Sequence, residues 1–137
     1  MSLEDVFSKI GIYKVKIVNG GIYRTRDSAI DFPVDDKKGT RTKHDFRTVV
    51  VLSCQSHCDD PAEEEVLIAP MSHTLAISRL TDCTVKPNRE NGLDASGRIL
   101  LSHIQPIPKA ALEKVIGRFT DWEWDTICAH VLSNIDR

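Results

Sequence analysis

The sequence predicts a mainly β fold of the α+β class, in which short strands form a small barrel or curled sheet with a C-terminal helical part. Two observations carry this prediction. Short β-branched or alternating runs separated by turn residues fill the chain up to residue 107, and helical spacing of apolar residues follows Pro108. The length of 137 residues fits a single domain, which we place at residues 1–137.

The N-terminal part, residues 1–18, is expected to hold a short helix and a strand. Residues 3–10 put their apolar side chains on one helical face, and residues 12–18 alternate apolar side chains with lysines as a half-buried strand does. Asn19–Gly20 then precedes a second extended run over residues 21–26. Because Asn-Gly favours a type I′ turn, the sequence predicts a hairpin here.

Residues 27–46 form a long, polar and basic loop with little periodicity. Long loops inside a compact domain are often functional. The loop contains the basic residues Lys37, Lys38, Arg41 and Lys43, and Arg47 follows directly after it, before the next predicted strand. On a chain with a formal net charge of −2, such a loop is compatible with an anionic ligand, although a merely solvated loop would show the same charges.

Four further segments read as strands. Residues 48–53 and 65–72 are continuous apolar runs, typical of strands covered on both faces. Residues 82–87 and 97–107 are separated by a stretch rich in turn residues. These segments complete the predicted sheet.

Residues 108–135 are expected to be the C-terminal helical part. Pro108 suits the first turn of a short helix that Gly117 would end. Thr120 and Glu123 form a capping box in front of a second helix. The buried face of that helix is predicted to contain Trp124, Ile127, Cys128, Val131, Leu132 and Ile135. Trp122 lies off this face, which makes it a candidate contact residue.

Several classes of site and location are not expected. No apolar stretch approaches the ~18 residues of a membrane span, and the N-terminus lacks a signal-peptide core, which predicts a cytoplasmic protein with reduced cysteines and no membrane contact. Cys54, His57 and Cys58 lack a second matching pair, so we expect no metal and interpret Cys54 as a core residue. Nucleotide-binding and esterase motifs are absent, and no cofactor is expected.

Polar side chains stand at the ends of the predicted strands. They are Arg47 before one strand, Ser72, His73 and Thr74 after the next, His103 in the last strand and His44 in the basic loop. Arginine can bind a phosphate through two parallel hydrogen bonds, a hydroxyl can donate to developing charge, and histidine can transfer protons near neutral pH. Such a set could cleave RNA by attack of a 2′-hydroxyl on the neighbouring phosphorus. Each histidine taken alone is more often structural than catalytic, and Ser72 alone could be an ordinary turn residue at a strand end.

Three segments follow one another over about residues 44–135: FRTVVVLS, EVLIAPMSHT and SGRILLSHIQPIPKAALEKVIGRFTDWEWDTICAHVL. In order and spacing they resemble the PemK/MazF family of toxin endoribonucleases (mRNA interferases) of type II toxin–antitoxin systems. The resemblance implies an SH3-like small β-barrel of the PemK/CcdB type with a C-terminal helix, a homodimer, and a cognate antitoxin. It also implies sequence-selective, metal-independent cleavage of single-stranded RNA such as mRNA.

The resemblance assigns roles to individual residues. Arg47 matches the catalytic arginine of the family, and Ser72 matches its catalytic Ser/Thr. The loop at 27–46 matches the loop that covers the RNA groove. The residues expected to bind RNA are therefore Lys37, Lys38, Arg41, Lys43, His73 and Thr74.

The sequence departs from the family pattern in its last predicted strand. Ser102–His103 stand where many members have Asp–Gln, and Leu100 stands where one branch has a second catalytic arginine. His103, His73 and His44 are the candidates to replace the missing acid or base, and Asp45 is a candidate to orient Arg47. Two alternatives remain open: a non-catalytic barrel toxin that binds a protein such as DNA gyrase, and a degenerate homologue that only binds RNA.

Overall fold

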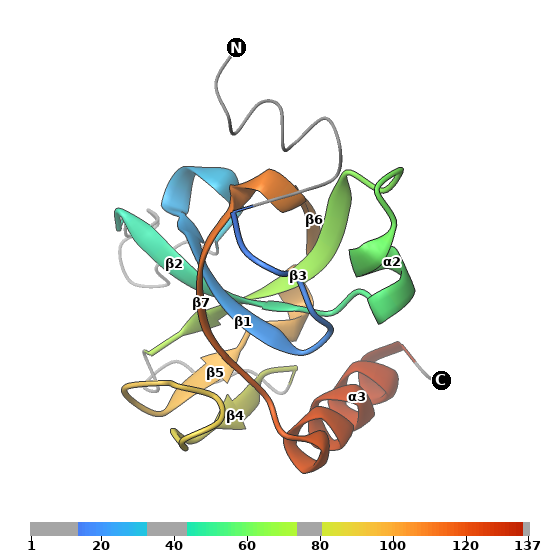
Figure 1. Ribbon diagram of the computed structural model, residues 1–137. Helices are drawn as coiled ribbons and strands as arrows, with labels where there is room; N and C mark the ends of the chain where they lie inside the picture. Colours follow the sequence, from blue (N-terminus) through green and yellow to red (C-terminus); the bar gives the residue numbers. More distant parts are fainter. Residues whose placement is uncertain (1–13, 33–43, 74–80, 136–137) are drawn as a thin grey trace.

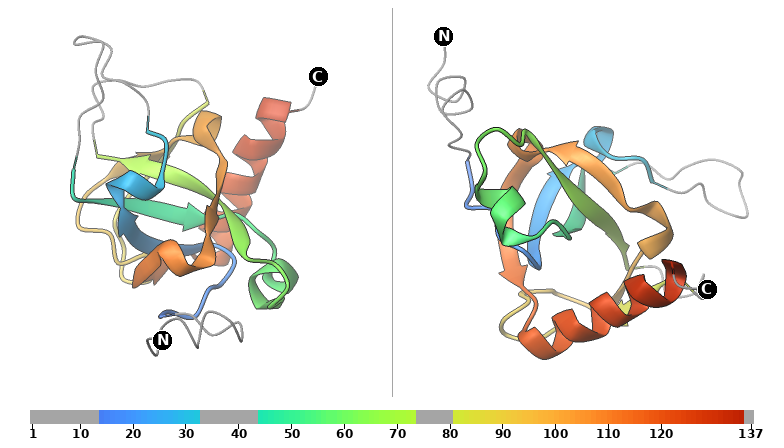
Figure 2. Two further views of the ribbon diagram at one scale, coloured as in Figure 1. Left: turned by 90° about the horizontal axis from the view of Figure 1, so that it is seen from above. Right: turned by 90° about the vertical axis from the view of Figure 1, so that its right-hand side faces the viewer.

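The computed structural model describes residues 14–32, 44–73 and 81–135. These residues form a strongly curved antiparallel sheet with one long helix packed against it (Figures 1 and 2). The strands are β1 (Gly21–Arg26), β2 (Phe46–Val51), β3 (Glu65–Ser72), β4 (Cys83–Val85), β5 (Gly97–Ile99), β6 (Gln105–Pro108) and β7 (Leu112–Arg118). The helices are α2 (Gln55–Asp59) and α3 (Asp121–Ile135), with 3-10 turns η1 (Asp27–Ala29), η2 (Leu101–His103) and η3 (Lys109–Ala111).

The strands lie in the order β4-β5-β3-β2-β1-β7, and β6 pairs with the first half of β3. Every described pairing is antiparallel. The predicted mainly β fold with a C-terminal helix is confirmed, in the form of a curled sheet whose described pairings do not close a full barrel.

The central strands are buried on both faces because two apolar clusters lie on opposite sides of them. Successive side chains of β2 point to opposite faces, so Val50 faces one cluster while Val49 and Val51 face the other. All three valines are fully buried, which explains the unbroken apolar run. Ile127 of α3 belongs to the Val50 cluster, and this places the helix on that face of the sheet (Figure 2).

The strand and hairpin predicted before β1 are wrong. The described residues 14–20 contain no strand, and β1 pairs instead with β2 and β7. Gly20 has φ 73°, whereas no described non-glycine residue has a positive φ, so Asn19 cannot be part of a type I′ turn. The buried Tyr23 hydroxyl donates to Lys16 O at 2.7 Å and accepts from Val18 N at 2.9 Å, and these bonds tie the segment down without strand pairing. The helix predicted over residues 3–10 lies outside the described residues.

The helix predicted over residues 108–117 is also wrong, because this segment is extended. After Pro108 ends β6, the turn η3 leads into β7, which pairs along β1. Lys109 lies in that turn with only 1% of its surface exposed, and its ammonium donates to the carbonyls of His57 and Asp60 at 2.8 and 2.9 Å. Burial of the lysine fixes the turn, and strand pairing then outweighs local helical spacing.

The remaining strand predictions are confirmed, with local differences in their bounds and one interruption. Residues 65–72 form β3, β2 begins two residues earlier than expected, and β4 occupies the centre of 82–87. The run 97–107 is broken by η2, so His103 lies in a 3-10 turn and not in a strand. Cys54 is exposed in front of α2, so its interpretation as a core residue is wrong, and Cys58 is the buried cysteine of this segment.

The capping box and the C-terminal helix are confirmed. Thr120 N donates to Glu123 Oε1 at 3.0 Å, and Glu123 N donates to Thr120 Oγ1 at 3.3 Å. Only the first part of the predicted buried face packs on the sheet, because Leu132 and Ile135 are 60% and 74% exposed. Trp122 is 77% exposed, as expected for a residue off the packed face. No helix in the described part of the chain has the length and apolar character of a membrane span.

Candidate functional site

A row of polar residues crosses the sheet at one end of its central strands. β1 pairs Thr25 with Arg47, and β3 pairs Ser72 with Arg98. Between β2 and β3 the ladder pairs Val49 with Pro70, and extending this register by two residues puts Arg47 opposite Ser72. Directly opposed residues of antiparallel strands share a face. Arg47, Ser72 and Arg98 therefore form one row, here called the polar row.

Arg47 is held on two sides. Its Nε donates to Asp27 Oδ2 at 2.7 Å, and its guanidinium carbon lies 3.7 Å from the centre of the Phe32 ring. The two side chains of the ion pair are 9% and 7% exposed. Pairing, stacking and burial together restrict the guanidinium to one orientation at the start of β2.

Asp27, and not Asp45, orients Arg47. Asp27 is the first residue of η1, and its N–H donates to the Asp45 carbonyl at 3.1 Å. Its Oδ2 also accepts from the backbone N–H of His44 at 3.2 Å. The sequence offered no signal for this role, because Asp27 lies twenty positions before Arg47 and only strand pairing brings them together.

Arg98 provides a second buried cation in the polar row. Its Nη1 donates to Asp82 Oδ2, and the two side chains are 7% and 2% exposed. A signal for this residue existed, since a charged side chain in the apolar run GRILL requires a buried partner. A Cβ at Gly97 would lie 3.0 Å from Ser72 O, so glycine permits the close approach of β5 to the end of β3.

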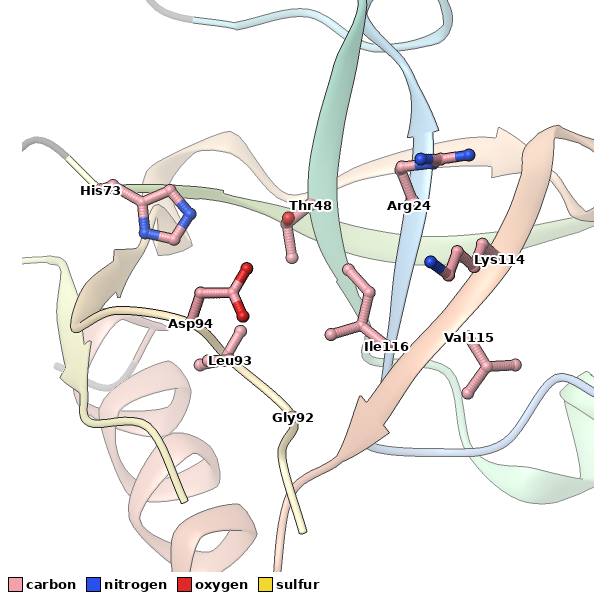
Figure 3. Close-up of a pocket in the computed structure, with 9 residues that line it drawn as sticks. All are labelled: Arg24, Thr48, His73, Gly92, Leu93, Asp94, Lys114, Val115 and Ile116. Carbon is pink, nitrogen blue, oxygen red and sulfur yellow. The ribbon is translucent and has the colours of Figure 1, made fainter. Parts of the chain in front are cut away.

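A cavity of about 390 Å³ opens on the opposite face of the same strand ends (Figure 3). It is lined by Arg24, Thr48, His73, Gly92, Leu93, Asp94, Lys114, Val115 and Ile116. Thr48 and His73 directly follow Arg47 and Ser72 in the chain. Except for His73, sequence reasoning did not select these residues.

The family now follows from a direct comparison. The profile of the family described as PemK-like, MazF-like toxin of type II toxin-antitoxin system matches residues 29–134. The chain belongs to this family. A search of curated protein sequences gives no significant match.

Solved structures of PemK/MazF toxins show the same fold. The toxin MazF-mt6 of Mycobacterium tuberculosis is 19% identical, with a TM-score of 0.62 over 85% of this chain and 96% of that one. An endoribonuclease in complex with its cognate antitoxin, from a mycobacterial species, is 15% identical, with a TM-score of 0.60 over 85% and 92%. A MazE–MazF structure from Deinococcus radiodurans is 12% identical, with a TM-score of 0.62 over 89% and 97%.

In this PemK-like chain the candidate histidines lie at three different places. His44 is exposed beside η1, and His73 is exposed at the cavity. His103 is half-buried, with its Nδ1 2.9 Å from Ser102 Oγ. Its carbonyl accepts from Gln105, whose side chain also bonds to the backbone of Asp31, the residue before Phe32. His103 is thus linked through these hydrogen bonds to the segment that holds Arg47.

Five of the predicted RNA-binding residues, namely Lys37, Lys38, Arg41, Lys43 and Thr74, lie outside the described residues. Within the described ranges, no group of three or more His, Cys, Asp or Glu side chains is arranged to hold a metal ion. Burial raises the pKa of the Cys58 and Cys83 thiols, which keeps both protonated and unreactive at neutral pH.

Proposed function

We propose that this PemK-like chain is a sequence-selective, metal-independent endoribonuclease toxin that cleaves single-stranded RNA by 2′-hydroxyl attack. The observation that carries the proposal is that Arg47 and Ser72 each stand two residues beyond the Val49–Pro70 pair, on one face of their strands, and that the ion pair with Asp27 orients the guanidinium. Similar structures are described as endoribonucleases, which supports the same activity here.

In this proposal the polar row binds the phosphodiester that is cleaved. Arg47 donates hydrogen bonds to its non-bridging oxygens and stabilises the charge that develops during attack. Ser72 adds a hydroxyl donor on the neighbouring strand, and the guanidinium of Arg98, which is paired with Asp82, lies on the strand beside it. All three lie on strands of the sheet, so their positions change little when RNA binds.

Proton transfer is assigned to a histidine, because the Asp–Gln pair of many family members is replaced by Ser102–His103. His103 is the first candidate, since its Nδ1 contacts the Ser102 hydroxyl and its segment is bonded to the loop beside Arg47. His44 is the second candidate, because its backbone bonds to the carboxylate that orients Arg47. Either imidazole can act as acid or base near neutral pH.

The test is cleavage of a long RNA by the purified protein in EDTA, with the cut ends mapped by sequencing. We expect 2′,3′-cyclic phosphate ends at a recurring short motif. Arg47→Ala should lower the rate by about 100-fold or more, the usual cost of losing a donor to developing charge. The matched control is Arg89→Ala, which removes an exposed arginine outside the polar row and should cleave as the wild type does.

Undiminished cleavage by Arg47→Ala would reject the assignment of the site. Binding of RNA without cleavage under any condition would identify a degenerate homologue. Intact RNA together with DNA gyrase trapped on DNA would select the protein-binding alternative.

We further propose that the toxin forms a homodimer and binds a cognate antitoxin in the cytoplasm. One similar structure contains an antitoxin and another is a MazE–MazF structure. Trp122, Leu132 and Ile135 are large exposed apolar side chains on α3 and are candidates for these interfaces. Light scattering at micromolar concentration should give the mass of two chains, and a monomer would contradict the dimer.

A further inference from the structure

The cavity on the face opposite the polar row combines cationic, anionic and apolar walls. Arg24 of β1 and Lys114 of β7 are directly paired, so their side chains leave the sheet on the same face. Figure 3 shows these two residues on one side of the cavity and His73 and Asp94 on the other. The volume of about 390 Å³ lies within the range of small-ligand sites.

The cationic wall has unused binding capacity. Within the described part of the chain, Arg24 Nε is buried and has no hydrogen-bond partner. The guanidinium carbon lies 4.2 Å from the centre of the Phe46 ring, and this stacking holds the group in place. Neither Arg24 nor Lys114 forms an ion pair with a described residue. A buried donor without a partner is uncommon in proteins and marks Arg24 as a residue whose place the described fold alone does not explain.

The cavity and the polar row share the same strand ends, because two residues that line the cavity follow two residues of the row in the sequence. Thr48 follows Arg47, and His73 follows Ser72; successive residues of a strand point to opposite faces. Both pairs stand at the same end of the sheet, where β2 begins and β3 ends. An RNA strand with one phosphate at the polar row can therefore pass over this rim and place its next nucleotide in the cavity.

We propose that this cavity binds the nucleotide next to the cleaved phosphodiester. Arg24 and Lys114 bind its phosphate, and Asp94 accepts a hydrogen bond from an exocyclic amino group of its base. Cytosine, adenine and guanine carry such a group and uracil does not. The inference rests on the proposed endoribonuclease function and adds to it a site that selects sequence.

The experiment uses fluorescent 2′-O-methyl oligocytidine, oligoadenosine and oligouridine, which lack the attacking 2′-hydroxyl and cannot be cleaved. Fluorescence anisotropy gives Kd for the full-length protein at several salt concentrations. The double variant Arg24→Gln/Lys114→Gln should bind oligocytidine about tenfold more weakly, as expected when charge-assisted hydrogen bonds are removed. Its plot of log Kd against log salt should be flatter by about 0.7 for each phosphate that the variant no longer binds.

Two further variants isolate the cause. Lys16→Gln removes an exposed lysine outside the cavity, and it should keep the wild-type salt slope. Asp94→Asn changes one exposed loop residue conservatively. It should keep the salt slope and lose the preference for oligocytidine and oligoadenosine over oligouridine. This variant tests the cavity even if the double variant folds poorly.

The outcomes separate this inference from the proposed function. Wild-type cleavage of RNA, with the double variant equal to Lys16→Gln in affinity and salt slope, overturns the cavity assignment alone. If the variants show the expected losses of affinity and base preference but the wild type does not cleave RNA, the cavity assignment stands and the proposed nuclease activity is rejected. If cytidine monophosphate binds with the same Kd as the oligomer, the ligand is a free nucleotide and the inference is overturned. No binding of any oligomer by the wild type would overturn it as well.

Discussion

Two polar clusters of the molecule satisfy their charged side chains in different ways, one by ion pairs and the other by hydrogen bonds from amide groups. The polar row holds two arginine–carboxylate pairs almost wholly out of solvent, Arg47–Asp27 and Arg98–Asp82. The second cluster, here called the cap network, joins Glu123 at the start of α3 to Asn88 and Asn91 by hydrogen bonds of amide groups. Buried ion pairs contribute little net stability, because desolvation offsets their attraction. The capping network stabilises the start of α3, and this role alone explains its presence. The buried charges, whose desolvation is costly, therefore lie where RNA chemistry is proposed.

The largest effect on stability is expected from removing the carboxylate that pairs with Arg47 of the polar row. Asp27→Ala leaves Arg47 buried without its carboxylate, and it should lower the free energy of unfolding by about 3–5 kcal/mol. Urea denaturation measures this loss. The matched control is Glu113→Ala, which breaks the 3.1 Å pair with Arg26, an arginine whose side chain is 68% exposed. That change should cost below about 1 kcal/mol. Equal losses for the two variants would contradict the distinction between buried and exposed pairs.

A smaller effect on stability, with a large effect on cleavage, is expected from replacing the whole second pair. Arg98→Met combined with Asp82→Leu removes both buried charges, and it should leave the free energy of unfolding unchanged or raise it by about 1–4 kcal/mol. RNA cleavage should fall if Arg98 serves the polar row. A folded double variant with full cleavage would show that the pair has no part in catalysis.

The cap network should contribute about 1 kcal/mol, in a manner that depends on pH. Burial alone would raise the pKa of Glu123, but hydrogen bonds from Thr120, Asn88 and Asn91 outweigh it and lower the pKa. Since the folded pKa is depressed, the stabilisation is present above the pKa of the unfolded chain and is lost as the pH falls through the folded value. Glu123→Gln should therefore be less stable than wild type at neutral pH and equally stable in acid. Thermal unfolding across pH tests this, and a gap that persists in acid would disprove it.

The smallest effect on stability is expected at Trp122, which is 77% exposed. Trp122→Ala should change the free energy of unfolding by no more than about 0.5 kcal/mol, as for surface sites away from special features. The substitution should instead weaken binding to the second copy of the chain or to the antitoxin, which light scattering measures. An unchanged assembly would remove Trp122 from the proposed interfaces.

The sequence predicted those parts of the molecule in which local pattern and tertiary environment agree. Continuous β-branched runs indicated β2 and β3, and the capping box located the start of α3. The pattern misled where tertiary packing overrides it. Residues 112–118 have helical spacing but become β7 because they complete the pairing of β1 on its other side, and Tyr23 holds the preceding segment by its hydroxyl.

The candidate site could be predicted only in part, for the same reason. Arg47 and Ser72 stand at strand ends that the sequence marks, so their residue types were visible. Asp27 meets Arg47, and Arg24 meets Lys114 on the opposite face, only through the pairing of strands, which no local pattern encodes.

The place of β1 between β2 and β7 bears on the order in which the sheet can assemble during synthesis. The pairing of β7 with β1 joins Ile22 to Gly117, which are far apart in the sequence. The Thr25 hydroxyl, in the strand that borders Arg47, donates to Ala111 O at 2.7 Å. Pairings between residues so distant in the sequence are slow to form because closing the loop between them costs entropy. β1 can pair with β2 as soon as both have been synthesised, but its other edge stays open until residues 112–118 have left the ribosome.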